Sequence, residues 1–203
     1  GDAVTLTATR KAVIPTESQL VYCPQDMVLG LGCARGCSVD EVMDLVMSGL
    51  SAANINAATI FCAVSLDLKA DEPAMHAVAA ILGVPFRVFD AATLEAETPR
   101  LANPSDVVFA EVGVHGVCEA ASLAAAGPAG KLVIEKRKST NATMALAQIP
   151  TLWDGRMPGR KPGRVMLIGI GPGQAAWRTP EASRLIQSAD ELVGYGLYID
   201  ILG

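Results

Sequence analysis

Two stretches of this sequence follow one order: a continuous apolar run, a loop and an amphipathic helix. The first run covers residues 27–31 and leads through the loop GLGCARG (30–36) into a helix capped by Ser38, with Glu41 completing a capping box. The second run covers residues 58–64 and leads through a polar loop into a helix over residues 72–82. Buried strands that alternate with helices predict an α/β fold with a mostly parallel sheet and helices on both faces.

The rest of the pattern extends this order. It predicts strands at residues 84–89, 107–112, 131–135, 165–170 and from 192, and helices at residues 92–97, 117–126, 142–148 and 180–189. We therefore predict four segments: an extended lead-in (1–25), a complete domain (26–149), a linker with solvated basic residues (150–163), and a truncated β-α-β start of another domain (164–203).

Composition restricts the classes of partner. With 51% apolar residues the chain has ample material for a core, and its net charge of −5 argues against a nucleic-acid or anionic-membrane partner. No apolar run reaches the length of a membrane span, and the first residues lack the layout of a signal peptide, so we expect a cytoplasmic protein. The five scattered cysteines favour reduced thiols, and we predict no metal site.

In open α/β sheets, ligands bind beyond the carboxyl ends of the strands, where this sequence places polar and glycine-rich loops. In the first loop, Gly30, Gly32 and Arg35 suit an anion near a helix N-terminus, or simply a tight turn with a surface arginine. In the second, Lys69 and Glu72 provide a cation for a substrate, or an exposed ion pair.

A third loop, residues 111–119, contains a histidine between glycines. His115 suits acid–base chemistry, and Gly113 and Glu119 flank it, although a carboxylate in a first helical turn is also explained by the helix dipole. Lys136 belongs to a basic run at a strand end, which suits a polyanionic ligand or a solvated turn.

Four ordered motifs carry a family resemblance. Residues 30–36, 65–69 with Glu72, 113–119 and 136–145 resemble the CbiG C-terminal/CobE family of cobalamin biosynthesis over residues 26–149, with a departure at Ala34, where the family loop often carries a second basic residue. This resemblance implies work on precorrin intermediates. The larger members resemble a cobalt-precorrin-5A hydrolase, which opens a lactone and releases acetaldehyde.

The resemblance implies a carboxylate-rich tetrapyrrole as substrate. It would be cradled by Gly30, Gly32, Gly113 and the charged residues Arg35, Lys69, Glu72 and Lys136, with His115 and Glu119 as candidate catalytic residues. A non-catalytic module that binds the tetrapyrrole and hands it on is the alternative. A generic nucleotide-binding α/β domain is a further one.

A second resemblance lies at the C-terminal end. Residues 165–173, 179–182 and 189–195 are similar to the start of precorrin-3B C17-methyltransferases, which take methyl groups from S-adenosylmethionine, with Gln174 where an acidic residue is common. This implies cofactor contacts at Gly169, Gly171, Pro172 and Gly173 in a full-length parent. The fragment is incomplete, so we expect no tight cofactor binding by this chain. We expect the fragment to pack on the first domain, to pair with a second copy as a homodimer, or to stay loosely ordered.

Overall fold

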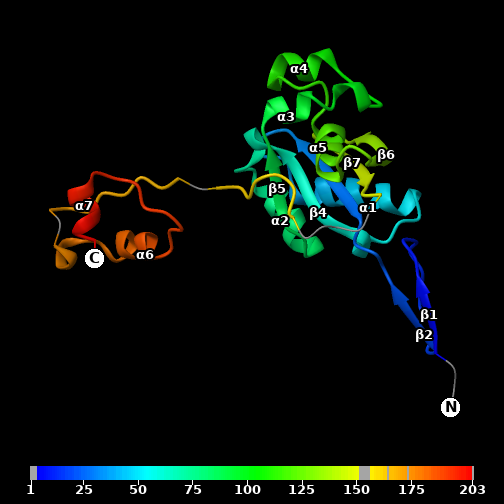
Figure 1. Cartoon of the computed structure of the whole chain (residues 1–203), viewed down its shortest axis with the longest axis horizontal. Coiled ribbons are helices and arrows are strands. Elements are labelled where there is room, and N and C mark those ends of the chain that lie inside the picture. The colour runs from blue at the N-terminus through cyan, green and yellow to red at the C-terminus, as the bar shows by residue number, and fades with distance from the viewer. Residues whose placement is uncertain (1–3, 151–155, 164, 173, 203) are drawn as a thin grey trace. The chain divides into compact units, whose positions relative to one another are not determined.

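The computed structural model describes residues 4–150, 156–163, 165–172 and 174–202 (Figure 1). The contacts within the chain divide it into two compact units, residues 1–162 and residues 163–203.

The first unit is built on a five-stranded sheet. Its strands lie in the order β5 (Phe86–Phe89), β4 (Ile60–Leu66), β3 (Met27–Cys33), β7 (Ala142–Gln148) and β6 (Lys131–Lys138). β3 pairs in parallel with β4, and β4 with β5, whereas β7 is antiparallel to both β3 and β6. Four of the five strands therefore run in one direction, which confirms the predicted α/β class with a mostly parallel sheet.

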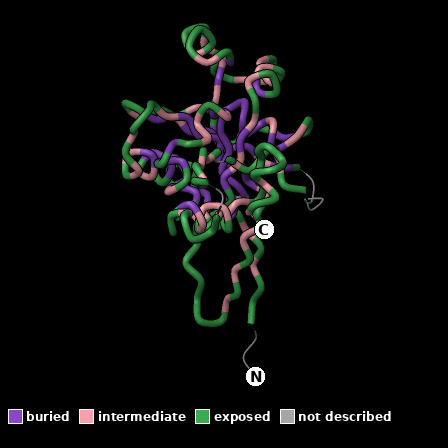
Figure 2. Tube along the Cα trace, turned by 90° about the vertical axis from the view of Figure 1, so that its left-hand side faces the viewer, coloured by how far each residue is buried: buried purple, intermediate pink, exposed green. Residues whose placement is uncertain are grey.

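Helices cover both faces of this sheet, because the side chains of each strand alternate between them. Met27, Leu29 and Leu31 of β3 belong to a buried cluster with α1 (Val39–Ala52) and α2 (Pro73–Leu82). Val28 belongs to a second cluster, with α3 (Ala91–Glu95) and α5 (Val117–Ala126). Figure 2 shows the buried residues gathered in the middle of this unit.

Two predicted elements of this unit are wrong. Residues 107–112 were predicted as a strand, but α4 (Asp106–Val112) is a helix in which no residue is buried. Ser105 caps its start, and Gly113 ends it with a φ of 72°. Residues 142–148 were predicted as helical, but they form β7, because a position between β3 and β6 outweighs the helix propensity of Ala, Met and Leu.

The N-terminal lead-in forms a small sheet of its own. β1 (Thr5–Ala8) and β2 (Gln19–Tyr22) pair in parallel and extend away from the buried core (Figure 2). The segment is fastened to the larger sheet by Arg10, whose guanidinium forms a bidentate ion pair with Asp26.

Part of the predicted linker is a strap on the edge strand β5. Val88 and Arg160 exchange two backbone hydrogen bonds of 2.8 Å, and the Arg87 guanidinium donates to the carbonyls of Pro158 and Gly159. The Arg160 side chain lies 3.0 Å from the Asp67 carboxylate. This part of the predicted linker therefore pairs with an edge strand, which offers unpaired backbone groups to a passing chain, while the Arg160 side chain stays 64% exposed.

The regular elements among the described residues of the second unit are helices. α6 (Pro180–Gln187) begins as predicted, with the Thr179 hydroxyl accepting the Ala182 N–H, and α7 (Gly196–Asp200) follows. The strands predicted at residues 165–170 and 192–195 are not formed, although both stretches are described. A strand needs a partner for its backbone groups, and none of the described residues of this unit pairs with either stretch.

No single helix among the described residues is long and apolar enough to cross a membrane, although α4 and α5, joined at an 81° bend, together meet that length and composition.

Candidate functional site

Three loops meet at the edge where the parallel strands end. They are residues 34–37 after β3, residues 67–72 after β4, and the β6–β7 turn at residues 139–141. The Ala34 N–H donates to the Asn141 carbonyl at 2.8 Å, and the Gly36 N–H donates to a Glu72 carboxylate oxygen at 3.0 Å. We call these three loops the carboxyl edge. It brings together Arg35, Lys69 and Glu72 from the predicted substrate site.

Arg35 is held by the second loop. Its guanidinium lies 2.5 Å from the Asp71 carboxylate and donates to the Leu68 carbonyl at 2.9 Å, and the buried Glu72 carboxylate lies 3.7 Å away. The hydrogen bond from Arg35 lowers the pKa of Asp71. The charge of Arg35 is therefore largely compensated within the protein.

Lys69 differs from Arg35 in lacking a fixed partner. It is half-buried at the end of the 3-10 helix Asp67–Lys69, and among the described residues its ammonium has no hydrogen bond or ion pair. Its charge acts on Cys33, a thiol whose pKa is raised to about 11 by burial and by the Glu72 charge, and on the Asp71 carboxylate, whose pKa is lowered mainly by Arg35 and also by Lys69. Because Asp71 is itself paired with Arg35 and Lys69 has no fixed partner among the described residues, the Lys69 ammonium can pair with an anionic ligand.

Glu41 joins the first and third loops. Its carboxylate accepts hydrogen bonds from the Ser139 hydroxyl, the Asn141 backbone and the Asn141 side chain, which lower its pKa to about 2. The predicted capping box is therefore only half formed. Ser38 accepts the Glu41 N–H at 3.1 Å, but the Glu41 side chain holds the β6–β7 turn instead of returning to Ser38.

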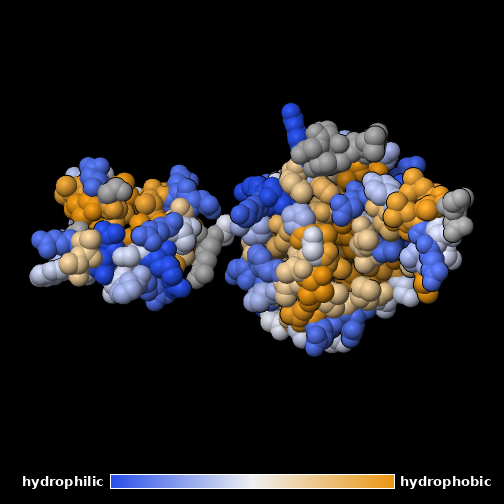
Figure 3. Space-filling view, turned by 90° about the horizontal axis from the view of Figure 1, so that it is seen from below, coloured by the Kyte–Doolittle hydropathy of each residue, from blue (hydrophilic) through white to orange (hydrophobic). Residues whose placement is uncertain are grey.

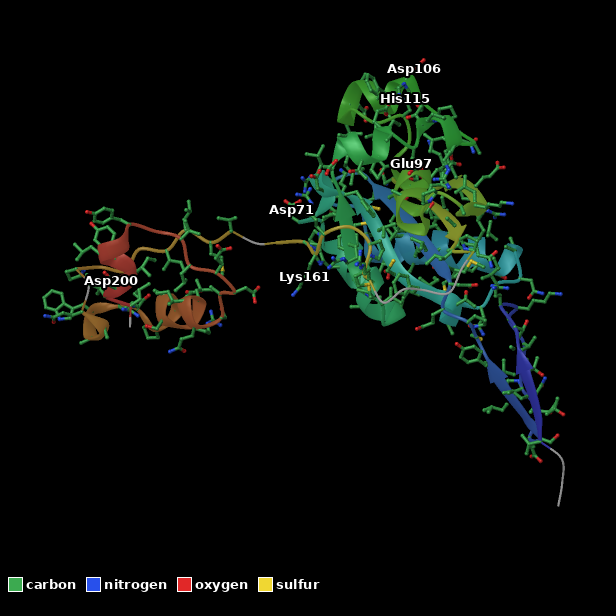
Figure 4. The ribbon with its side chains drawn as sticks, in the orientation of Figure 1. Asp71, Glu97, Asp106, His115, Lys161 and Asp200 are labelled. Carbon is green, nitrogen blue, oxygen red and sulfur yellow. The ribbon has the colours of Figure 1, made fainter. Side chains whose placement is uncertain are left out.

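His115 lies at the same end of the sheet. The residue two positions later, Val117, begins α5 against β3, and an ideal Cβ on Gly32 would lie 3.7 Å from the Val117 Cβ. The His115 ring stacks on Phe109 and contacts two carboxylates, Glu95 at Nδ1 (2.8 Å) and Asp106 at Nε2 (3.5 Å). Figure 4 shows Asp106 beside His115.

Glu119, the second candidate catalytic residue, is an anchor. It is 1% exposed, and its carboxylate accepts four hydrogen bonds, from the Ala102 and Asn103 backbones, the Asn103 side chain and the Lys136 backbone. These bonds hold residues 102–103 and β6 against α5. Each carboxylate oxygen already accepts two hydrogen bonds, which leaves it little capacity for proton transfer. We therefore propose a structural role for Glu119.

Several of the remaining predicted site residues lie within a strand or end a helix. Gly30 and Gly32 are buried inside β3, not in the loop, and Gly113 is the positive-φ residue that ends α4. Lys136 lies within β6 and contributes its backbone N–H to Glu119. Gly169, Gly171 and Pro172 belong to the second unit, and Gly173 lies outside the described residues. Ligand contacts by these residues stay predictions.

An apolar groove lies elsewhere on the first unit. It has a volume of about 370 Å³ and is lined by the segment Ala12 to Ile14, by Met47 and Leu50 of α1, and by residues 54–57. These residues adjoin the N-terminal segment and the last turn of α1, whereas the carboxyl edge lies at the first turn of that helix. Within the described residues, no group of three or more His, Cys, Asp or Glu side chains is arranged to hold a metal ion.

Comparison with known proteins gives one family. The model described as "Cobalamin synthesis G C-terminus" matches residues 27–147. Protein CobE of Sinorhizobium sp is 47% identical over 126 residues, which cover 62% of this chain and 82% of that protein. The crystal structure of CobE, "a protein from the cobalamin (vitamin B12) biosynthetic pathway", superposes with a TM-score of 0.58 at 35% identity, over 62% of this chain and 91% of that one.

Two longer relatives match in part. The cobalt-precorrin-5A hydrolase of Priestia megaterium is 31% identical over 134 residues, 66% of this chain but only 35% of the hydrolase. The cobalamin biosynthesis protein CobIJ of Mycobacterium tuberculosis is 32% identical over 117 residues, 51% of this chain and 23% of CobIJ.

Proposed function

The chain belongs to the cobalamin synthesis G C-terminus family and is a cobalamin biosynthesis protein of the CobE/CbiG type, and from this premise we propose that it binds a precorrin through the carboxylates of that tetrapyrrole at the carboxyl edge. A corrin precursor carries many acetate and propionate groups. The observation that carries the proposal is the Lys69 cation where three loops meet, which has no ion pair among the described residues.

Arg35 supports the same ligand in a different way. Its guanidinium is 58% exposed although it is held by Asp71, so it presents N–H donors in a fixed direction. A planar guanidinium can bind a carboxylate through two parallel hydrogen bonds, whereas an ammonium such as Lys69 acts as a point charge. Together the two residues select an acidic ligand that reaches both loops.

Replacing Lys69 with glutamine tests this proposal. We expect Lys69→Gln to weaken the binding of cobalt-precorrin-5A by about tenfold, because one charge-assisted hydrogen bond is lost. Isothermal titration calorimetry measures the dissociation constant. The matched control is Lys131→Gln, which makes the same change of charge at an exposed position where β6 begins, at the opposite end of the sheet. Equal affinities for Lys69→Gln, Lys131→Gln and the unmodified protein would refute binding at Lys69.

Two activities are compatible with such binding. The protein either hydrolyses its ligand, as the name of the Priestia relative states for that protein, or holds the ligand and hands it on without chemistry. We favour hydrolysis, because His115 at the same end of the sheet is a histidine held by a carboxylate. The mass of the bound tetrapyrrole after incubation distinguishes the two activities, since hydrolysis changes that mass and hand-over leaves it unchanged.

We propose further that residues 164–203 begin a methyltransferase domain of a longer parent. The support is the resemblance of residues 165–195, together with apolar side chains that this unit leaves at its surface (Figure 3), such as Val165 (92% exposed) and Leu167 (99% exposed). A predicted strand with exposed apolar residues needs further chain, or a second copy, to pair with. The strand that would lead into the glycine loop is not formed, so we assign no methyl transfer from S-adenosylmethionine to this chain.

A further inference from the structure

The contacts of Glu95 single it out among the residues around His115. One Glu95 oxygen accepts from the His115 ring Nδ1 at 2.8 Å, and the other accepts from the His115 backbone N–H at 3.1 Å. Partial burial raises the pKa of Glu95, but these two hydrogen bonds outweigh that effect and leave its pKa below the usual value. Glu95 is therefore an ionised carboxylate that fixes both the ring and the backbone of His115.

This geometry determines which ring nitrogen is free. An ionised carboxylate only accepts hydrogen bonds, and Glu95 lies 2.8 Å from Nδ1 whereas Asp106 lies 3.5 Å from Nε2. A neutral His115 ring therefore carries its proton on Nδ1, and Nε2 keeps its lone pair. The other histidine of the chain shows the opposite arrangement. His76 Nε2 lies 2.6 Å from the Ala70 carbonyl, which requires the proton on Nε2. The two histidines are thus held in opposite tautomers.

The free nitrogen is open to a ligand. The His115 side chain is 24% exposed, and the residue nearest to Nε2, Asp106, is fully exposed on α4 (Figure 4). Two side chains of α4 border the ring, Phe109 on one face and Asp106 beside Nε2, but neither residue is buried. Glu97 and Arg100, also in this region, pair with each other. A water molecule or a substrate oxygen can therefore reach Nε2.

We propose that His115 is the acid–base residue of this site and that Glu95 is its positioning residue, in the hydrolysis of an ester on the bound macrocycle. The inference rests on the proposed function for its substrate. As a water oxygen bonds to the ester carbonyl carbon, one water proton passes to Nε2, and the Glu95 carboxylate stabilises the resulting imidazolium. The bond from carbon to the leaving oxygen then breaks, and that oxygen takes the proton back. The products are a carboxylic acid and an alcohol.

Two variants and one control test these roles. His115→Gln removes the acid–base group, and Glu95→Gln keeps the size of the side chain but removes its charge and one of its two acceptor oxygens. Glu111→Gln is the control, because it makes the same change of charge at an exposed position of the neighbouring helix α4. Each full-length protein is incubated with cobalt-precorrin-5A, and we measure binding by calorimetry, turnover by product mass, and stability by thermal unfolding.

We expect His115→Gln to lower kcat by about 10²- to 10⁴-fold, the usual contribution of general acid–base catalysis, with KM nearly unchanged. Glu95→Gln should lower kcat by about tenfold or more for the same reason, also without a comparable change in KM, and Glu111→Gln should leave both unchanged. A loss of structure would instead lower the midpoint of thermal unfolding and weaken binding together with turnover.

Nitrogen NMR of the histidine rings reads the tautomers directly. At a pH where both rings are neutral, we expect His115 as the Nδ1–H form and His76 as the Nε2–H form, and Glu95→Gln should increase the Nε2–H population of His115 only. A neutral His115 in the Nε2–H form in the unmodified protein would overturn the positioning role. Binding of the tetrapyrrole without any mass change would overturn the catalytic role and leave the proposed binding intact, whereas absence of binding would overturn both.

Discussion

Glu119→Ala should lower the free energy of unfolding of the first unit by about 3–5 kcal/mol, the cost of breaking a buried charged interaction by removing one partner. Four donors would lose their acceptor at once, and each buried donor left without a partner costs about 1–3 kcal/mol before the structure relaxes. Urea unfolding followed by circular dichroism measures the change.

Glu119→Gln separates charge and hydrogen bonding from packing. The amide has almost the same shape, but its NH₂ group would face two N–H donors, so we expect it to be destabilising as well, by less than Glu119→Ala. Glu135→Gln on the exposed side of β6 is the control and should change the free energy of unfolding little. If Glu119→Gln unfolds at the same urea concentration as the unmodified protein, the carboxylate is not an anchor, and its predicted catalytic role regains interest.

Gly30→Ala should lower the free energy of unfolding of the first unit at least as much as Glu119→Ala does. An ideal Cβ at Gly30 would lie 1.8 Å from the carbonyl oxygen of Cys118, a backbone atom of α5 that cannot move away without displacing the helix from the sheet. We therefore expect the free energy of unfolding to fall by more than the roughly 1–3 kcal/mol that ordinary overpacking costs. Soluble expression and urea unfolding measure the effect.

Gly36→Ala is the matched control for this substitution. Gly36 has a φ of 70° and open space around its Cβ position, so only backbone strain opposes alanine there, at about 1–2 kcal/mol. If Gly30→Ala proves as mild as Gly36→Ala, the close approach of α5 to β3 is not what position 30 requires.

The fold was predictable where local pattern and tertiary packing agree. The apolar run at residues 27–31 and the helix capped by Ser38 form as expected, because a buried parallel strand needs apolar residues on both sides. The pattern failed at α4 and β7. Val107 and Val108 favour a strand, but the cap at Ser105 and the glycine at position 113 define a short helix that no sheet reaches. Residues 142–148 consist largely of helix formers, and only their position between two strands makes them a strand.

Part of the candidate site was also predictable from the sequence. Because Arg35, Lys69 and Glu72 follow directly after parallel strands, their meeting at one edge follows from the topology alone. Glu95 and Glu41 were missed as partners of the site, because their contacts lie 20 residues away at His115 and 98 residues away at Ser139. The sequence placed Glu119 beside His115, and only the fold shows that its buried carboxylate accepts four hydrogen bonds.

The central claim is that a carboxylate-rich tetrapyrrole binds at the carboxyl edge, and amide NMR during a titration with cobalt-precorrin-5A tests it most directly. We predict the largest shifts at residues 34–37, 67–72 and 139–141, with smaller shifts near His115. Shifts confined to the groove lined by Val13, Ile14 and Met47 would contradict the account, because that groove lies by the last turn of α1, away from the loops that contain Arg35 and Lys69.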